Sequence, residues 1–459
     1  MNHGSCIAWL SIAFLVRVSA TEGIVETLGQ RVYPHVGDDD MCIDDSTSAD
    51  GGILAQARFN YPWGIAYDEQ TWNVYVADCG CADTSKENDK IRRINLKEKT
   101  VSTVSGSSQG FEDGNGEVAK FAHTAGMALD SVNKKMYIAD SGNDVIRAMD
   151  LKNYEVSTYA GKGREKGFLD GIVNSARFDN PQQLELHKST KRLYIADTDN
   201  HAIRVINMTG AVHVVRTITG GPTQIGYLDG SLTEAKWQHP TGMAYDLKND
   251  ILYVSDHYNH VIRKINFQKG YVTTIAGTGK AGSLDSSISG GVFLNYPEGL
   301  AYDGRYNVLY VAEFGNNCIR MVNLTNMSLR VLAGNKLGTR DAIGRDAQFY
   351  HPTCLTLDRA NMLLYVTDQY NHRVRTVTTL GNTKQADSKN MVFKHLGHVD
   401  AYRDYYVHHG TTLLTSLYLL VALLFVFLLL CCARHRYGIR AFAMKLAGYQ
   451  RLNKHQRFV

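Results

Sequence analysis

The sequence predicts an all-β fold, a six-bladed β-propeller, joined to one C-terminal transmembrane α-helix. The first observation is a unit of 56 to 62 residues that occurs six times between residues 24 and 380. The second is an uncharged, apolar run of 22 residues, Thr411 to Cys432. A unit of that length is typical of one four-stranded propeller blade, and the apolar run is long enough to cross a bilayer as a helix.

An apolar stretch at the start of the sequence predicts a cleaved signal peptide over residues 1–20. The run from Cys6 to Val16 is too short to span a bilayer, and Val18-Ser19-Ala20 follows it with small residues of the kind that signal peptidase accepts. Arg17 interrupts the end of the run, and no Lys or Arg precedes it. We therefore expect residue 21 onward to lie in an extracellular or lumenal compartment.

Each repeat begins with an aromatic residue, usually has Pro three positions later, and continues into an apolar strand. A second strand then ends in an acidic residue, and an Ile-Arg or Val-Arg pair begins a third. Such short β-branched and apolar runs, bounded by Asp, Gly and Asn, predict strands. The six aromatic residues are Phe59, Phe121, Phe178, Trp237, Phe293 and Phe349.

The last repeat lacks the fourth, outermost strand that the other repeats have, because a polar segment follows it directly. A matching run, GIVETLG, lies at residues 23–29. We expect this run to complete the last blade and close the ring, which removes the exposed sheet edges. The predicted propeller therefore covers residues 21–380, and residues 381–410 form a juxtamembrane tether.

Asn-His occurs before the Ile/Val-Arg pair in three repeats, at Asn200-His201, Asn259-His260 and Asn371-His372. With six copies in register, the repeat resembles the NHL family, which is named for an Asn-His-Leu run. The resemblance covers roughly residues 24–380 and implies a six-bladed propeller. It does not imply one function, because propellers of this kind serve enzymes, receptors, sensors and RNA-binding proteins.

The repeated acidic residues and arginines are expected to be structural. They occur once per blade at matching positions, so we expect each acid to cap a turn and to pair with the Arg of its own blade. The acids are Asp78, Asp140, Asp197, Asp256, Glu313 and Asp368, and the arginines are Arg92, Arg147, Arg204, Arg263, Arg320 and Arg375.

A channel metal is the alternative that would make the propeller an enzyme. The resemblance extends to a peptide-amidating lyase, in which a zinc ligand directly follows the Pro of this kind of motif, but no His occupies that slot here. Lactonase-like propellers hold calcium through carboxylates and amides, and only Gln182 and Glu298 among these slots could do so. We therefore expect no cofactor, with channel calcium left open.

Residues that differ between blades at the slots and turns of one face are the candidate ligand-binding residues. Exposed aromatic and amide side chains on a rigid platform suit recognition of a protein or glycan. The candidates are Trp63, Gln182, Gln183, His257, Tyr258, Glu298, Phe314, Gln369 and Tyr370.

Five cysteines outside the predicted signal and span could form disulfides in an oxidising compartment. Cys42 could pair with Cys79 or Cys81 in a blade 1 insertion, and Cys318 could pair with Cys354 in the next blade. Because five is odd, one thiol would remain free or pair with another chain. Asn207, Asn323 and Asn326 begin N-glycosylation sequons in exposed turns.

Residues 433–459 form a predicted cytoplasmic tail, because they hold seven Lys or Arg and no acid directly after the span. Its basic charge should bind anionic membrane lipid. Cys431 and Cys432 are palmitoylation candidates at the membrane edge. Tyr449 and Leu452 fit a tyrosine-based sorting signal that clathrin adaptors read.

These features predict a single-pass type I protein of the plasma membrane or endosomal system, acting as a receptor or adhesion protein. Leaving the tail and Arg17 out of the net charge of +4 gives about −4 for the lumenal part, which argues against a nucleic-acid partner. A membrane-anchored lumenal lactonase or lyase is the alternative, and a structural surface protein is the second alternative.

Overall fold

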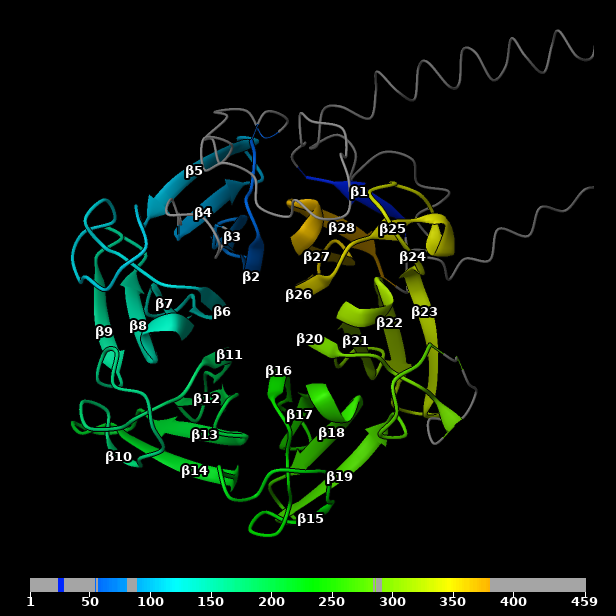
Figure 1. Ribbon diagram of the computed structural model, residues 1–459. Coiled ribbons are helices and arrows are strands. Elements are labelled where there is room, and N and C mark those ends of the chain that lie inside the picture. The colour runs from blue at the N-terminus through cyan, green and yellow to red at the C-terminus, as the bar shows by residue number, and fades with distance from the viewer. Residues whose placement is uncertain are drawn as a thin grey trace, which may run out of the picture. The chain divides into compact units, whose positions relative to one another are not determined.

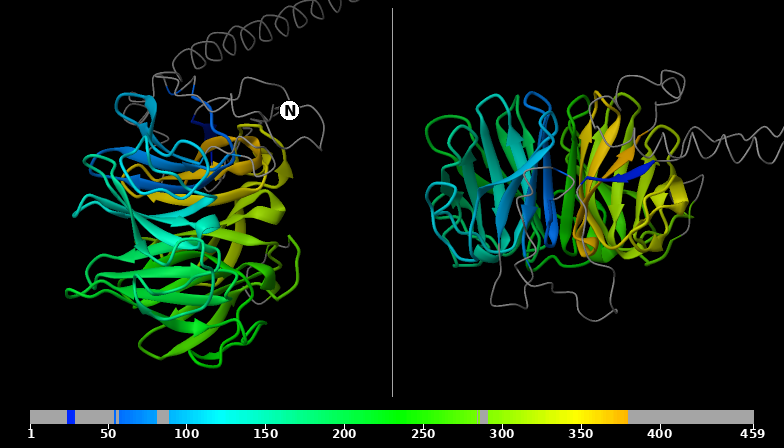
Figure 2. Two further views of the ribbon diagram at one scale, coloured as in Figure 1. Left: turned by 60° about the vertical axis from the view of Figure 1, so that its left-hand side comes forward. Right: turned by 90° about the horizontal axis from the view of Figure 1, so that it is seen from above.

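A computed structural model of the chain describes residues 24–28, 54, 57–80, 89–283, 285 and 291–379. These residues form six antiparallel sheets that stand side by side around a central axis (Figure 1). Seen from the side, the sheets form a short, wide ring (Figure 2). The predicted all-β, six-bladed propeller is confirmed.

Four main strands make each blade, and in blades 1 to 5 these four follow one another along the chain from the innermost strand outward. Blades 1 and 2 contain β2 (Pro62–Asp68), β3 (Asn73–Asp78), β4 (Lys90–Asn95), β5 (Thr100–Ser105), β6 (Thr124–Asp130), β7 (Lys135–Asp140), β8 (Val145–Asp150) and β9 (Val156–Ala160). Blades 3 and 4 contain β11 (Pro181–His187), β12 (Arg192–Asp197), β13 (Ala202–Asn207), β14 (Val214–Gly220), β16 (Pro240–Asp246), β17 (Ile251–Asp256), β18 (Val261–Asn266) and β19 (Tyr271–Ala276). Blades 5 and 6 contain β20 (Pro297–Asp303), β21 (Val308–Glu313), β22 (Cys318–Asn323), β23 (Ser328–Gly334), β26 (Pro352–Asp358), β27 (Leu363–Asp368) and β28 (Arg373–Thr378).

Shorter elements decorate the blades. Two-residue strands are β10 (Gly171–Ile172), β15 (Gly230–Ser231), β24 (Lys336–Leu337) and β25 (Gln348–Phe349). Single-turn 3₁₀ helices are η3 (Ser141–Asn143), η4 (His257–Asn259), η6 (Phe314–Asn316), η7 (Gly344–Asp346) and η8 (Gln369–Asn371). All of these 3₁₀ helices except η7 directly follow the second strand of a blade, so they lie at equivalent places around the ring.

Strand β1 (Val25–Thr27) closes the ring by adding a fourth strand to blade 6 (Figure 1). It pairs antiparallel with β28, with Val25 opposite Val377. The Thr27 backbone N–H and hydroxyl both donate to the carboxylate of Asp341, at 3.1 and 3.0 Å. The predicted closure of the last blade by residues 23–29 is therefore confirmed.

The hydrophobic core lies between neighbouring blades, because both faces of each sheet are covered by the next sheet. One such cluster joins Tyr253 of blade 4 to Leu300 and Leu309 of blade 5. The inner strands approach closely near their starts. A Cβ on Gly242 would lie 1.9 Å from the carbonyl oxygen of Glu298, so only glycine fits there.

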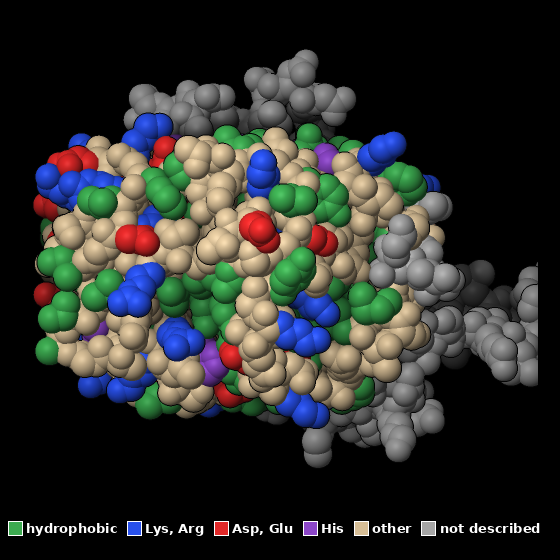
Figure 3. Space-filling model, turned by 90° about the horizontal axis from the view of Figure 1, so that it is seen from below, with side chains coloured by type: hydrophobic (Ala, Val, Ile, Leu, Met, Phe, Trp, Pro, Cys, Tyr) green, Lys and Arg blue, Asp and Glu red, His purple; other side chains and the backbone are tan. Residues whose placement is uncertain are grey.

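The side wall of blades 3 and 4 presents apolar side chains with Lys, Arg, Asp and Glu scattered among them (Figure 3). Ile172, Val212, Ile225 and Leu228 are among the exposed hydrophobic residues of these two blades. On this side the charges do not gather into one basic patch. The mixed side chains of this wall do not indicate a particular class of ligand.

Several predictions concern segments outside the described residues. These are the signal peptide (1–20), the tether (381–410), the span (411–432) and the tail (433–459), together with Cys42, Cys81, Cys431, Cys432, Tyr449 and Leu452. Within the described part of the chain, no helix has the length and apolar character needed to cross a membrane.

The predicted disulfide between Cys318 and Cys354 is wrong. Both are buried, free thiols, as is Cys79. Cys318 begins β22 and its Sγ lies 3.4 Å from a carboxylate oxygen of Glu313, whereas Cys354 packs near the start of the inner strand of blade 6. Position in consecutive blades therefore did not place these two side chains together.

Candidate ligand-binding site

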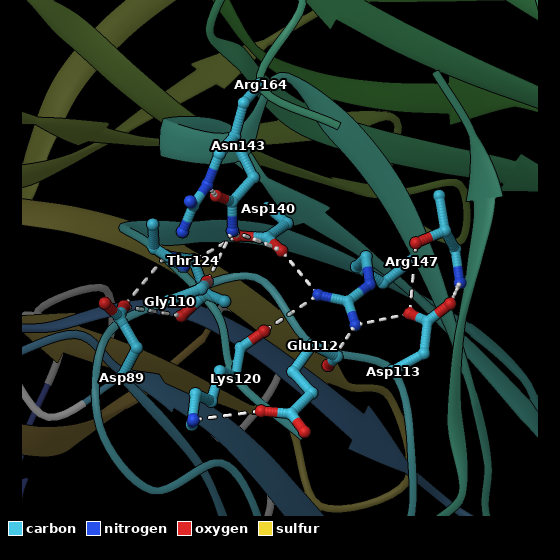
Figure 4. Close-up of polar contacts among 12 residues, drawn as sticks. Asp89, Gly110, Glu112, Asp113, Lys120, Thr124, Asp140, Asn143, Arg147 and Arg164 are labelled. Carbon is cyan, nitrogen blue, oxygen red and sulfur yellow. Dashed lines mark hydrogen bonds and ion pairs between the residues drawn. The ribbon is translucent and has the colours of Figure 1, made fainter. Parts of the chain in front are cut away.

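The repeated arginines hold each blade together from inside. In blade 2, the Arg147 guanidinium donates to Asp140 at 2.7 Å and to Asp113 at 2.6 Å (Figure 4). Asp113 in turn accepts from the backbone N–H of Thr158, at 3.0 Å. The side chains of Arg147 and Asp140 are fully buried. The same acid–Arg pair occurs in all six blades. The expected structural role is confirmed, which removes these twelve residues from the candidate site.

The histidine of the Asn-His run joins neighbouring blades. It follows the 3₁₀ turn in a left-handed backbone conformation, with φ of 53° at His260 and 55° at His372. Its Nδ1 accepts from a backbone N–H of the next blade, as His260 does from Tyr296 at 3.1 Å. Burial lowers the pKa of His260, which keeps the imidazole neutral and able to accept.

Aspartate or asparagine fills the same place in other blades. Asp144 accepts from Asn180 at 2.9 Å, and Asn317 accepts from His351 at 2.9 Å. The shared requirement is a residue that tolerates the left-handed region and carries an acceptor, which Asn, Asp and His satisfy best. These histidines are therefore hydrogen-bond acceptors between blades.

One end of the ring carries a continuous series of aromatic and imidazole rings, which we call the aromatic arc. Its residues come either from the two positions before the first residue of the inner strand or from the 3₁₀ turn after the second strand. These positions share one end of the blade, because the first residue of the inner strand pairs with the last residue of the second strand, as Pro240 does with Asp256. The arc consists of Tyr61, His239, His257, Tyr258, Tyr296, Phe314, Tyr350, His351 and Tyr370.

Ring contacts run through the arc from blade 4 to blade 1. The centroids of His239 and Tyr258 are 4.2 Å apart, and those of His257 and Tyr296 are 5.0 Å apart. Phe314 lies 6.3 Å from His257. Beyond it, centroid distances are 3.9 Å for Phe314–His351, 4.5 Å for His351–Tyr370 and 4.9 Å for Tyr370–Tyr61. Tyr258 is 45% exposed and Tyr296 36%, so a ligand can reach the rings.

An ion pair stands within the arc. His257 Nδ1 lies 2.7 Å from Glu298 Oε2 and 3.1 Å from the carbonyl oxygen of Pro297. Because both partners are acceptors, Nδ1 carries the proton. Burial by itself would lower the pKa of His257, but the charge and hydrogen bond of Glu298 raise it above its ordinary value.

The other histidines of the arc are held neutral. Burial lowers the pKa of His351 to about 4 and also lowers the pKa of His239. His257 is therefore the histidine of the arc that gains a proton most readily, and it does so next to a carboxylate.

Five of the nine candidate residues from the sequence meet in or beside the arc: His257, Tyr258, Glu298, Phe314 and Tyr370. The other four are Trp63, Gln182, Gln183 and Gln369.

These four do not join the arc through any hydrogen bond or ring contact recorded among the described residues. Trp63 packs against core clusters on both sides of blade 1. Gln183 lies over Gly126 of blade 2, where a Cβ would be 1.7 Å from its Oε1. Gln369 is buried, and Gln182 is half-buried in β11.

Sequence reasoning missed the five residues of the arc at the two positions before the inner strand: Tyr61, His239, Tyr296, Tyr350 and His351. The signal was present, because the residue directly before the inner strand varies between blades just as the turn residues do. It has positive φ throughout, 55° at Tyr61 and 50° at Tyr296, where a large side chain is unusual.

Asn207 ends β13 and is exposed, Asn323 ends β22 and is half-buried, and Asn326 lies exposed in the turn after β22. No group of three or more His, Cys, Asp or Glu that could hold a metal ion occurs among the described residues.

Comparison with known proteins supports the repeat assignment. No protein-family model matches the chain. The chloroplastic protein SUPPRESSOR OF QUENCHING 1 of Arabidopsis thaliana is 31% identical over 289 residues, which are 60% of this chain and 26% of that protein. Human NHL repeat-containing protein 2 is 29% identical over 310 residues, 61% of this chain and 41% of that protein. The chain thus spans less than half the length of these relatives.

Solved structures share the fold. An auxiliary nutrient binding protein from Bacteroides thetaiotaomicron aligns with a TM-score of 0.56 at 14% identity, over 78% of this chain and 76% of that one. A protein of the same description from Bacteroides ovatus gives 0.53, also at 14% identity, over 78% and 77%. Such low identity shows the fold alone. The six repeats and the closed ring make this chain a six-bladed β-propeller, and its sequence is similar to that of NHL repeat-containing protein 2.

Proposed function

We propose that this chain is a receptor or adhesion protein whose propeller binds a protein or glycan ligand through the aromatic arc. The observation that carries the proposal is the continuous series of nine aromatic and imidazole rings at one end of the ring. Tyrosine and phenylalanine supply large contact areas at low conformational cost, and they dominate recognition surfaces for that reason.

The scaffold itself does not require these rings. In blades 2 and 3 the places of His257 and Tyr258 are taken by small or polar residues, Ser141 and Gly142, then Thr198 and Asp199. The Arg–acid pairs and the hydrogen bonds between blades are nevertheless complete there. The aromatic side chains are therefore not needed for the fold, and they form a surface on it.

The location that we propose is the plasma membrane or the endosomal system, with the propeller outside or in a lumen. The predicted signal peptide (1–20) and span (411–432) support this orientation. Within the tail, Tyr449 and Leu452 would bind a clathrin adaptor, and the basic residues would contact membrane lipid. Glycans on Asn207, Asn323 and Asn326 would project away from the aromatic arc, since their turns lie at the opposite ends of the strands.

A lumenal enzyme is the second candidate, and the His257–Glu298 pair is the observation that favours it, because a carboxylate-oriented imidazole can transfer protons. Bound metal in the purified protein, measured by mass spectrometry, separates the two. Stoichiometric calcium or zinc would favour the enzyme. A structural surface protein would show neither a metal nor a ligand.

The test of the receptor function is capture of the full-length protein, in detergent micelles, on a panel of cell types. We expect saturable binding that the triple variant Tyr258→Ala, Tyr296→Ala, Phe314→Ala abolishes. Lys166→Ala, which removes a side chain that is 72% exposed in blade 3, is the matched control and should bind as the wild type does. Equal binding by the triple variant would overturn the proposal.

A further inference from the structure

We propose that the centre of the aromatic arc, around His257, is a subsite for one neutral sugar ring of a glycan. This inference rests on the proposed function and specifies the chemistry of its ligand. Three aromatic rings surround His257, with centroids at 5.1 Å for Tyr258, 5.0 Å for Tyr296 and 6.3 Å for Phe314.

The rings offer flat, apolar faces at different inclinations. Tyr258 and Tyr296 meet edge to face, at 75° between planes, and His257 and Phe314 are inclined by 64°. A pyranose ring has an apolar face of C–H groups that packs on an aromatic face, and hydroxyl groups at its edge. Surfaces at an angle can therefore contact the face and the edge of one sugar at once.

Polar groups are present where the hydroxyls need them. The Nδ1 atom of His257 is engaged by Glu298 and Pro297, and no partner for Nε2 is recorded among the described residues. The same holds for the phenolic oxygens of Tyr258 and Tyr296. These three groups can donate to or accept from sugar hydroxyls, in an orientation that Glu298 fixes by holding the imidazole.

The charge of the subsite selects a neutral ligand. Two carboxylates contact the arc: Glu298, at its centre, is paired with His257, and Asp199, at its blade 4 end, lies 3.5 Å from His239 Nε2. An anionic or cationic ligand would lose hydration without gaining an unpaired counter-charge.

The experiment is saturation-transfer NMR on the full-length protein in detergent micelles. The probes are the methyl glycosides of glucose, galactose, mannose and N-acetylglucosamine, and the glucuronide that adds a carboxylate to the glucoside. We expect transfer to the C–H protons of at least one neutral glycoside, with a Kd on the order of 1–10 mM for so small a contact.

Variants of two residues separate the contributions of ring and hydroxyl. Tyr258→Ala should weaken binding of that glycoside about tenfold, and Tyr258→Phe about twofold or less, because it keeps the ring. Glu298→Gln should weaken binding about threefold by loosening the imidazole, and Lys166→Ala should have no effect.

Three results would overturn the sugar subsite: no transfer to any neutral glycoside, binding unchanged in Tyr258→Ala, or binding of the glucuronide alone. In each case, capture on cells that still depends on Tyr258, Tyr296 and Phe314 would leave the receptor function standing with a protein ligand. If neither sugar binding nor capture on cells depended on these residues, both the sugar subsite and the receptor function would be overturned. Competition of cell capture by the bound glycoside would tie the sugar to the receptor's own ligand.

Discussion

The turn after the second strand of a blade carries different residues in the aromatic arc and on the opposite side of the same face, in blades 2 and 3. In blades 2 and 3 the turn starts with Ser141 or Thr198, whose hydroxyl donates to a Pro carbonyl of the next blade. In blade 5 the turn starts with Phe314, which has no donor and stacks on His351 instead. Neighbouring blades pack together in both regions. The first residue of the turn can therefore vary without loss of the fold, as long as the other contacts between blades are kept.

The largest effect should come from the feature that both regions share. Arg204→Met in blade 3 and Arg263→Met in blade 4 each leave two carboxylates without their buried partner, and each should lower the free energy of unfolding by about 3–5 kcal/mol. Urea denaturation measures the loss. A much smaller loss in either blade would show that the Arg–acid pair is not common scaffold.

Binding should distinguish the two regions more sharply than stability does. The double variant Tyr258→Ala, Phe314→Ala should weaken capture on cells by about 2–3 kcal/mol, because the proposed ligand site includes both rings at the centre of the arc. Titrating the binding signal measures the change, with Lys166→Ala as the control from the other region. If the control weakens capture as much, the difference between the regions is not functional.

The ion pair of the arc should make the stability of the fold depend on pH through His257. Because the pKa of His257 is raised in the folded state, the pair stabilises the fold at pH below the ordinary value of 6.5. This contribution is lost as the pH rises through the folded-state pKa.

Glu298→Gln isolates that contribution. The stability difference between wild type and this variant, measured by denaturation from about pH 5 to about pH 9, should shrink as the pH rises. NMR titration should show a lower pKa for His257 in the variant, since burial then acts without the carboxylate. An unchanged pKa would contradict the pairing.

The smallest effect concerns the hydrogen bond between blades, which both regions make with different residues. His260→Ala should cost about 1 kcal/mol of unfolding free energy by leaving the Tyr296 N–H without its acceptor. His260→Asn should restore most of that loss, because Asn317 already plays this part in blade 5. Thermal denaturation of the three proteins provides the comparison, and failure of the Asn variant to recover would point to a role for the imidazole ring itself.

The sequence predicts the repeated parts of this protein better than the varied parts. The Arg–acid pairs and the closure by β1 were predictable, because six copies in register separate structural residues from the others. The arc was predictable only in part. Trp63 is predicted as a ligand-binding residue, but it packs against core clusters next to the irregular pairing after Pro62, and its neighbour Tyr61 lies in the arc instead. Spacing along the chain does not reveal such a shift in register.

Closure of the ring also determines how the propeller would respond to mechanical load. Strand β28 is held on one side by β27 and on the other by β1, so tension applied through residue 379 would have to strip β28 from two neighbours at once. The weaker of these two seams has only three residue pairs. A protease that cut between β1 and β2 would remove the covalent link between β1 and the rest of the propeller. The pairing of β1 with β28 could then dissociate, and the ring would open at blade 6.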